Sequence, residues 1–172
     1  MTQDLSRPDL DVALQTIANP DPATAGSGGH RTAKRAIAIL EATDPSFVAP
    51  TASQRNALLV AFARRRKVIY GAAFDIVRLT RKVDLDDPAD LASNLDAIVL
   101  YEIKSTNRAS IGEDLKGYFF ALSTAELLVA QSLGEQYRFA FVNTVTGKYR
   151  DMKLREIFAQ ARGIYPTWSI RF

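Results

Sequence analysis

Three side chains of the kind that can hold a metal ion beside a phosphate lie on two apolar stretches. Asp75 lies within Ala73–Leu79, and Glu102 and Lys104 follow directly on Ala97–Tyr101. Because side chains alternate along a strand, Glu102 and Lys104 point to the same side, and Asp75 is the one acid on an apolar face. Two neighbouring strands would bring the three together. Two acids and a lysine can hold a divalent metal beside a phosphate, and the pattern predicts this chemistry.

The same residues have simpler interpretations. Glu102 and Lys104 would form an ion pair at the end of a strand without any metal, since charges at a buried strand end are costly unless they are paired. Asp75 would be a hydrogen-bonded buried acid, or the partner of Arg78 or Arg81. Short charged motifs are common, so the metal site is a hypothesis to be weighed against these alternatives.

The elements that must position these residues alternate between helical and strand-like patterns. Two capping boxes, Thr51–Gln54 and Ser123–Glu126, mark helix starts, and Ser123 and Glu126 are interpreted as caps and not as catalysts. Gly134 is expected to end the second of these helices. Helices are expected at residues 31–42, 51–62, 123–133 and 154–159, and strands at 68–79, 97–104, 118–122, 137–143 and 167–170. This order predicts an α/β (α+β) protein with a mixed β-sheet flanked by helices.

The chain is long enough for one domain with its own hydrophobic core. Residues 1–30 are expected to form an N-terminal arm, with a short helical extension around 10–17 and a flexible linker rich in proline and glycine at 19–30. Residues 31–172 are expected to form a single domain, with its core at 67–145.

The stretch 84–94 holds four aspartates and Pro88, and we expect an acidic loop there. It lacks the glycine and the closing glutamate of an EF-hand calcium loop, so a solvated loop is the interpretation. Asp96 competes with Asp75 as the first acid of the site. However, six residues along one strand span about 20 Å, which is too far to share an ion with Glu102.

The net charge of +3 is unevenly distributed. Residues 51–82 contain eight basic and one acidic side chain, and residues 83–100 contain five acidic and no basic ones. The basic block includes the consecutive residues Arg64, Arg65, Arg66 and Lys67. Such a patch suits a polyanion, because each phosphate contact releases counterions. A solvated helix end stabilised by the helix dipole is the other interpretation, and both remain open.

Composition excludes several chemistries. There is no cysteine, which excludes disulfides, zinc–thiolate sites and cysteine nucleophiles, and the single histidine, His30, rules out multi-histidine metal sites. No apolar run approaches the roughly 20 residues of a membrane span. The N-terminal residues are polar and lack the hydrophobic segment of a signal peptide. We therefore expect no membrane association and a cytoplasmic location.

The residues around the three charged positions resemble the PD-(D/E)xK nuclease superfamily, in which an Asp on one strand precedes Glu-x-Lys on the next. The matching segments are Gly71–Ile76 and Tyr101–Thr106. The segments that follow, Phe119–Glu126 and Tyr137–Asn143, are similar to the protein NO VEIN C-terminal domain family, a nuclease-like module often attached to restriction and helicase proteins. The resemblance covers roughly residues 67–145. The 26 residues between Asp75 and Glu102 form a longer connection than related modules usually have.

The resemblance implies a restriction-endonuclease-like fold and an Mg²⁺- or Mn²⁺-dependent endonuclease that hydrolyses the phosphodiester bonds of DNA, in restriction or phage defence. RNA is an open alternative substrate. Asp75 and Glu102, with the Ile103 carbonyl, would ligate the ion, which prefers oxygen ligands. Lys104 would orient or help to deprotonate the attacking water and offset charge in the transition state.

The resemblance also implies a homodimer if both strands are cut, or a partner protein from a larger restriction or defence system. Asn107 and Arg108 follow the motif closely enough to touch a phosphate, although loop polarity explains them equally well. Glu41 is an auxiliary candidate metal ligand, and Gln131 could reach the site from the later helix; surface positions explain both. The alternative function is a catalytically inactive nuclease-fold module that binds nucleic acid or a partner protein. A purely structural interaction domain is the third reading.

Overall fold

A computed structural model describes residues 28–165 of the chain. The helix expected around residues 10–17, most of the expected linker and the strand expected at 167–170 lie outside this range. The last three residues of the expected linker, 28–30, belong to the first described helix, which therefore begins three residues earlier than expected.

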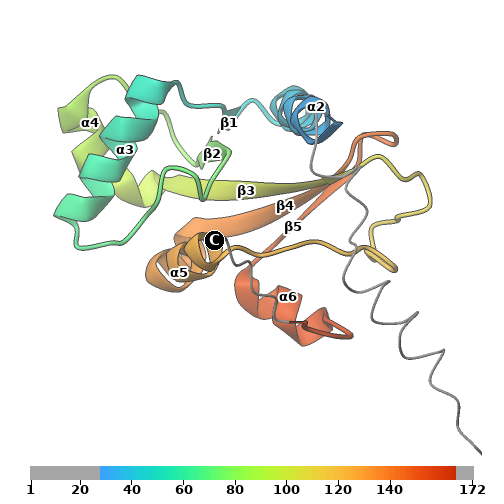
Figure 1. Cartoon of the computed structure of the whole chain (residues 1–172). Helices are drawn as coiled ribbons and strands as arrows, with labels where there is room; N and C mark the ends of the chain where they lie inside the picture. Colours follow the sequence, from blue (N-terminus) through green and yellow to red (C-terminus); the bar gives the residue numbers. More distant parts are fainter. Residues whose placement is uncertain (1–27, 166–172) are drawn as a thin grey trace, which may run out of the picture.

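The strands form one five-stranded sheet in the order β1-β2-β3-β4-β5 (Figure 1). They are β1 (Phe47–Val48), β2 (Ile76–Leu79), β3 (Ile98–Thr106), β4 (Tyr137–Asn143) and β5 (Tyr149–Met152). The helices are α2 (Gly28–Thr43), α3 (Ala52–Arg64), α4 (Pro88–Ser93), α5 (Thr124–Leu133) and α6 (Leu154–Gln160), with 3₁₀ turns at Leu95–Ala97 and Gly134–Gln136. All strand pairs are antiparallel except β3 with β4, which are parallel. A mixed sheet flanked by helices is therefore confirmed.

Strand β3 is the middle strand of the sheet, and its two halves have different neighbours. Strand β2 pairs with Ile98–Tyr101, whereas β4 pairs with Leu100–Thr106. Two parallel neighbours require a crossover connection, and α5 lies on it. Figure 1 shows the segment between β3 and α5, in yellow, turning back at the end of β3 to reach α5. The second half of β3 is thus not covered by β2, and this is where Glu102 and Lys104 lie.

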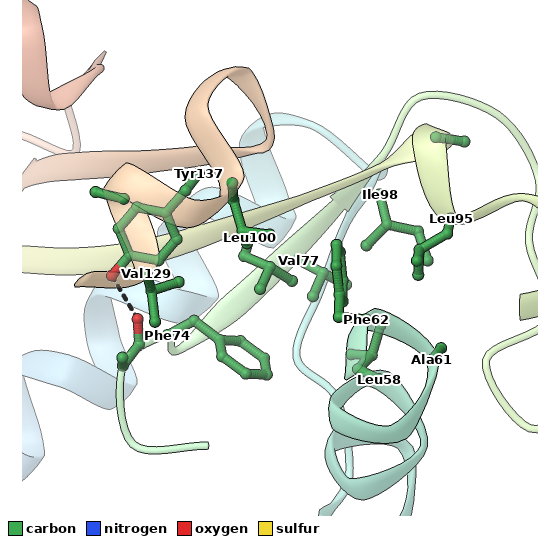
Figure 2. Packing of buried hydrophobic residues seen from close by; sticks show 14 of the residues in the cluster. Leu58, Ala61, Phe62, Phe74, Val77, Leu95, Ile98, Leu100, Val129 and Tyr137 are labelled. Carbon is green, nitrogen blue, oxygen red and sulfur yellow. Dashed lines mark hydrogen bonds between the residues drawn. The ribbon is translucent and has the colours of Figure 1, made fainter. Parts of the chain in front are cut away.

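The two faces of the sheet carry separate cores. Helix α2 covers one face, where Ala36 and Leu40 pack with Tyr101 and Ile103. Helices α3, α5 and α6 cover the other face. Figure 2 shows this second core, in which residues of α3 and α5 lie against the sheet: Leu58, Phe62, Val77, Ile98, Leu100 and Val129. Apolar burial on both faces therefore fixes the orientation of β3, with Glu102 and Lys104 on the α5 side.

Both capping boxes expected from the sequence are formed. The Thr51 hydroxyl accepts a hydrogen bond from the Gln54 amide at 3.2 Å, and the Gln54 side chain accepts one from the Thr51 amide at 3.0 Å. Ser123 and Glu126 make the same pair at the start of α5, each at 3.2 Å. Gly134 ends α5 with φ of 56°, a positive value that glycine adopts without strain.

The end of α3 also has a residue with positive φ, and this residue is not glycine. Arg66 has φ of 57°. Its amide donates to Ala63 O at 2.9 Å, and the Lys67 amide donates to Phe62 O at 3.0 Å. These two bonds form a Schellman motif, in which the left-handed position usually holds glycine because other side chains are strained there.

Three expectations about elements were wrong. The strand expected at 68–79 is limited to Ile76–Leu79, because residues 67–75 form an irregular segment held by side chains of α3 and α5. Residues 118–122 do not form a strand: Tyr118 and Phe120 pack on Phe141 while Phe119 is 77% exposed. The acidic stretch 84–94 contains α4, which the Asp87 side chain caps.

Strands β1 and β5 were not expected from the sequence, and they lie at the two edges of the sheet. Within residues 28–165, no helix has the combination of length and apolar character needed to cross a membrane.

Candidate active site

The pairing of β2 with β3 places Asp75 at the level of Glu102. Ile76 is opposite Tyr101, and the Asp75 amide donates to Tyr101 O at 2.8 Å. The Asp75 carboxylate in turn accepts a hydrogen bond from the Ile103 amide at 2.8 Å. Asp75 is therefore a partly buried, hydrogen-bonded acid that lies directly before β2, next to Glu102.

Arg78 and Arg81, the alternative partners of Asp75, pair with other acids. Arg78 forms an ion pair with Asp44 at 2.9 Å, and Arg81 forms one with Asp96 at 2.8 Å. Asp96 accordingly lies away from the candidate site, as the distance argument predicts.

Lys104 lies between two carboxylates from different elements. Its Nζ is 2.9 Å from Glu102 Oε1 and 2.8 Å from Glu126 Oε2, and all three side chains are nearly buried. The expectation that Glu102 and Lys104 point to the same side is confirmed. Glu126 was interpreted only as a helix cap, but the carboxylate that caps α5 also binds Lys104. The site thus contains a third acid.

Burial is the largest cause of the pKa shifts of the two acids on β3 and before β2. Burial raises the pKa of Glu102 to about 8, and the negative charge of Asp75 adds to this, while Lys104 offsets part of it. Burial also raises the pKa of Asp75, against the hydrogen bond from Ile103. Burial alone would lower the pKa of Lys104, but the carboxylates of Glu102 and Glu126 outweigh it and raise the pKa. The acids therefore lack sufficient cationic compensation.

Arg55 of α3 binds the irregular segment that precedes β2 and contains Asp75. Its guanidinium donates to the carbonyls of Gly71 at 2.8 Å, of Phe74, and of Asp75 at 3.3 Å. It also lies 4.2 Å from the centre of the Phe74 ring. Burial lowers the pKa of Arg55, and the charges of Asp75 and Glu102 act in the opposite direction. Sequence reasoning missed this residue, since one arginine in an amphipathic helix is not a distinctive signal.

Tyr137 packs next to the same acids. Its hydroxyl donates to the carbonyl of Ala73, and Figure 2 marks this bond. Burial raises the pKa of Tyr137, and the carboxylates of Glu102, Glu126 and Asp75 raise it further. The hydroxyl therefore stays protonated and joins β4 to the segment before β2.

The donor set fits a hard divalent cation. Within the described chain, Asp75, Glu102 and Glu126 each keep one carboxylate oxygen free of hydrogen bonds. The N–H and C=O of one strand residue point to the same side, so the Ile103 carbonyl also faces Asp75. Mg²⁺ is commonly held by one or two carboxylates with waters and phosphate oxygens. No three Asp, Glu or His side chains between residues 28 and 165 form a ready-made cage, so water or substrate oxygens would complete the shell.

The basic run is not part of this cluster. Arg64, Arg65, Arg66 and Lys67 are exposed at the end of α3. Arg55 and Arg64 are nine positions apart, or about 14 Å along a helix axis. Lys67 Nζ donates to Ser132 O near the C-terminal end of α5, whereas Glu126 lies in its first turn. The basic run therefore lies near the C-terminal ends of α3 and α5, whereas Arg55 and Glu126 lie near their N-terminal ends.

The remaining candidates do not join the acids. Glu41 is exposed on α2, on the opposite face of the sheet, and accepts a hydrogen bond from the Ala49 amide at 3.1 Å. Gln131 is exposed on α5. Asn107 and Arg108 are exposed directly after β3, and the Arg108 amide donates to Thr106 Oγ1 at 3.2 Å.

Comparison with protein-family models, curated proteins and solved structures gives no match to this chain. The resemblance to PD-(D/E)xK nucleases therefore remains a prediction from the motif.

Proposed function

We propose that this protein is an Mg²⁺-dependent endonuclease that hydrolyses phosphodiester bonds of DNA. The observation that supports it best is the position of Asp75 at the level of Glu102, with Lys104 on the same face. Acids whose burial the neighbouring cations do not fully offset, on the half of β3 that β2 does not pair with, are suited to a divalent ion and an anionic substrate.

Each residue has a role in this proposal. Asp75, Glu102 and the Ile103 carbonyl would hold the ion. A bound Mg²⁺ supplies polarisation of the scissile phosphate and a lower pKa for bound water. Lys104 orients the attacking water and offsets charge that develops on the phosphate. Glu126 keeps Lys104 in place when Glu102 turns to the ion, because it binds the same ammonium group independently.

A nucleic-acid-binding module without catalysis is the second candidate. The observation that favours it is the complete ion-pair network, in which Lys104 already has two carboxylate partners. Such a network stabilises a fold without any metal, and the exposed basic run would still bind phosphates.

The test is cleavage of plasmid DNA with Mg²⁺ or Mn²⁺ by the native protein and by Asp75→Asn and Lys104→Ala. Asp96→Asn is the matched control, because Asp96 is an exposed aspartate paired with Arg81. We expect metal-dependent cleavage that both site variants lose and the control retains, with circular dichroism showing folded protein in each case. Absence of cleavage by the native protein on double-stranded DNA, single-stranded DNA and RNA would favour the binding module.

The proposed biological setting is restriction or phage defence in the cytoplasm, alone or with a partner protein. Cutting both strands of a duplex requires two centres, so we expect two copies on duplex DNA. Sedimentation velocity of the protein with and without a short duplex measures this directly.

A further inference from the structure

A cavity of about 240 Å³ lies beside Lys104, on the side away from Asp75. Lys104 is level with Phe141 of β4, and Phe141 is level with Arg150 of β5, so the three side chains form one row on the same face of the sheet. The segment after β3, shown in yellow in Figure 1, supplies the opposite wall through Ile111 and Tyr118.

The wall of the cavity includes the aromatic residues Tyr118, Phe141 and Tyr149. The ring of Tyr118 meets that of Phe141 edge-on, with centroids 6.0 Å apart, and Phe120 packs on Phe141 at 4.9 Å. The Tyr118 hydroxyl donates to Ser105 O at 2.9 Å, which fixes the ring. An apolar ring can therefore enter a hollow whose wall is already ordered, and ligand sites are typically apolar hollows of this kind.

Three basic side chains line the cavity, and two of them are paired with acids. Lys104, Lys148 and Arg150 line it together with one acid, Glu113. Lys148 pairs with the Glu113 carboxylate at 2.9 Å, whereas Arg150 donates to the Glu113 carbonyl at 3.1 Å and so keeps its charge uncompensated by that contact. A partly aromatic wall beside Arg150, which forms no ion pair among residues 28–165, suits a ligand that has an apolar ring and an anionic group, which describes a nucleotide.

We propose that this cavity takes the base of the nucleotide whose phosphate lies at Lys104, so that the protein acts on a base that has left the double-helical stack. The inference rests on the proposed function, because it takes that phosphate as the reacting one. A cavity of this size holds one base and no base pair. A base inside a duplex cannot reach it, so the substrate is single-stranded nucleic acid or a duplex in which one nucleotide is flipped out.

The first experiment measures binding of 2-aminopurine deoxyribonucleoside 5′-monophosphate by its fluorescence, without metal. Ala109→Leu fills the cavity from an exposed position on its wall, and Ala42→Leu on α2 is the matched control on the other face of the sheet. We expect saturable binding by the native protein and the control, and about tenfold weaker binding by Ala109→Leu, which corresponds to the loss of one stacked base. No saturable binding by the native protein, or equal binding by the two variants, would overturn the proposal.

The second experiment separates the base from the phosphate. Arg150→Gln is expected to weaken binding of the nucleotide but not of the free base, because only the nucleotide carries a negative charge. In a duplex with one 2-aminopurine, the native protein is expected to change the fluorescence more at a mismatch than at a matched pair. Equal effects of Arg150→Gln on both ligands, or equal fluorescence changes in both duplexes, would contradict the proposal.

These measurements need neither metal nor cleavage, so the two proposals fail separately. A protein that binds the nucleotide through the cavity but does not cut contradicts only the nuclease function. A protein that cuts but shows no Ala109-dependent binding contradicts only the role of the cavity.

Discussion

Lys104 is a central residue of the candidate site and also part of the core, because two nearly buried carboxylates depend on it. Loss of one partner of a buried ion pair leaves unpaired charge in a poorly solvated place, which costs more than the pair contributes. A loss of activity in a Lys104 variant therefore needs a measurement of stability beside it.

We predict that Lys104→Ala lowers the free energy of unfolding by about 3 kcal/mol. The double variant Lys104→Met with Glu102→Gln is expected to recover part of this loss, because it removes Lys104 together with one of its two carboxyl partners. Urea unfolding of the three proteins at neutral pH measures both effects. A Lys104→Ala variant as stable as the native protein would contradict the prediction, because it would mean that the two carboxyl groups do not depend on the Lys104 ammonium group.

The raised pKa of Glu102 predicts how stability depends on pH. Its carboxyl has a pKa of about 8 in the folded protein against an ordinary value of 4.5. Between these values the folded state keeps a proton that the unfolded state has lost, so stability falls as pH rises through this window. The shift of Asp75 acts in the same direction.

We therefore expect Glu102→Gln to flatten the fall in stability between pH 5 and pH 8 and to be more stable than the native protein at pH 8, by on the order of a few kcal/mol. Urea unfolding in EDTA across this range measures it. Parallel pH profiles for the two proteins would contradict the prediction. Added Mg²⁺ should raise the melting temperature of the native protein at pH 8 more than that of Asp75→Asn, since binding stabilises the folded state.

At the scale of elements, α3 and α5 begin with the same kind of capping box but differ in what the cap supports. On α5 the capping carboxylate, Glu126, also binds Lys104. On α3 the corresponding residue, Gln54, reaches the exposed Asp86 at 2.8 Å. The two capping boxes can therefore be compared directly: the one on α3 only caps a helix, whereas the one on α5 also positions a residue of the candidate site.

We predict that Ser123→Ala and Thr51→Ala each lower the free energy of unfolding by about 1 kcal/mol, the usual effect of losing a cap. Only Ser123→Ala is expected to reduce cleavage or metal affinity, because it loosens the first turn that holds Glu126. Denaturant unfolding and the assay of the native activity check the two effects. Equal functional losses would mean that Glu126 does not depend on its cap.

The end of α3 predicts a conflict between stability and binding at Arg66. Glycine fits the left-handed conformation there without strain, so Arg66→Gly should stabilise the protein by about 1 kcal/mol. If the basic run contacts phosphates, the same change should weaken nucleic-acid binding and reduce the slope of log affinity against log salt by roughly 0.9. Thermal unfolding and a salt titration of binding measure both; an unchanged slope would remove Arg66 from the interface.

The elements that sequence reasoning predicted are those with strong local signals. Capping boxes, the glycine at the end of α5, the continuous apolar run of β3 and the alternation in β4 all depend on neighbouring residues. The edge strands were not predicted because β1 has only two residues and β5 is largely polar, with Arg150 and Asp151 next to each other. The aromatic residues at 118–120 suggested a strand, but their contacts with Phe141 come from tertiary packing.

Across the whole molecule, the distinction between local sequence signals and tertiary packing also explains which residues of the candidate site could be predicted. Asp75, Glu102 and Lys104 could be predicted to meet because each lies on or beside a strand with period-two patterning. Arg55 and Glu126 could not be predicted to join them. They lie on helices, and no local sequence pattern specifies how a helix packs on the sheet. Glu126 was also already explained as part of a capping box, so its second role, binding Lys104, was not predicted.

The hydrogen bond from the Ile103 amide to the Asp75 carboxylate makes the site observable in solution through one proton. Strand β3 is central in the sheet, so its amides should exchange with solvent mainly through global unfolding. The Ile103 amide differs, since a side chain protects it. We predict that Asp75→Ala speeds exchange at Ile103 far more than at Leu100, whereas Asp75→Asn, which keeps an acceptor oxygen, largely preserves protection. Hydrogen-exchange NMR measures both rates, and equal acceleration at both amides would mean that the variant had destabilised the whole fold. The exchange rate of the Ile103 amide would then report whether the Asp75 carboxylate is in place, without any substrate.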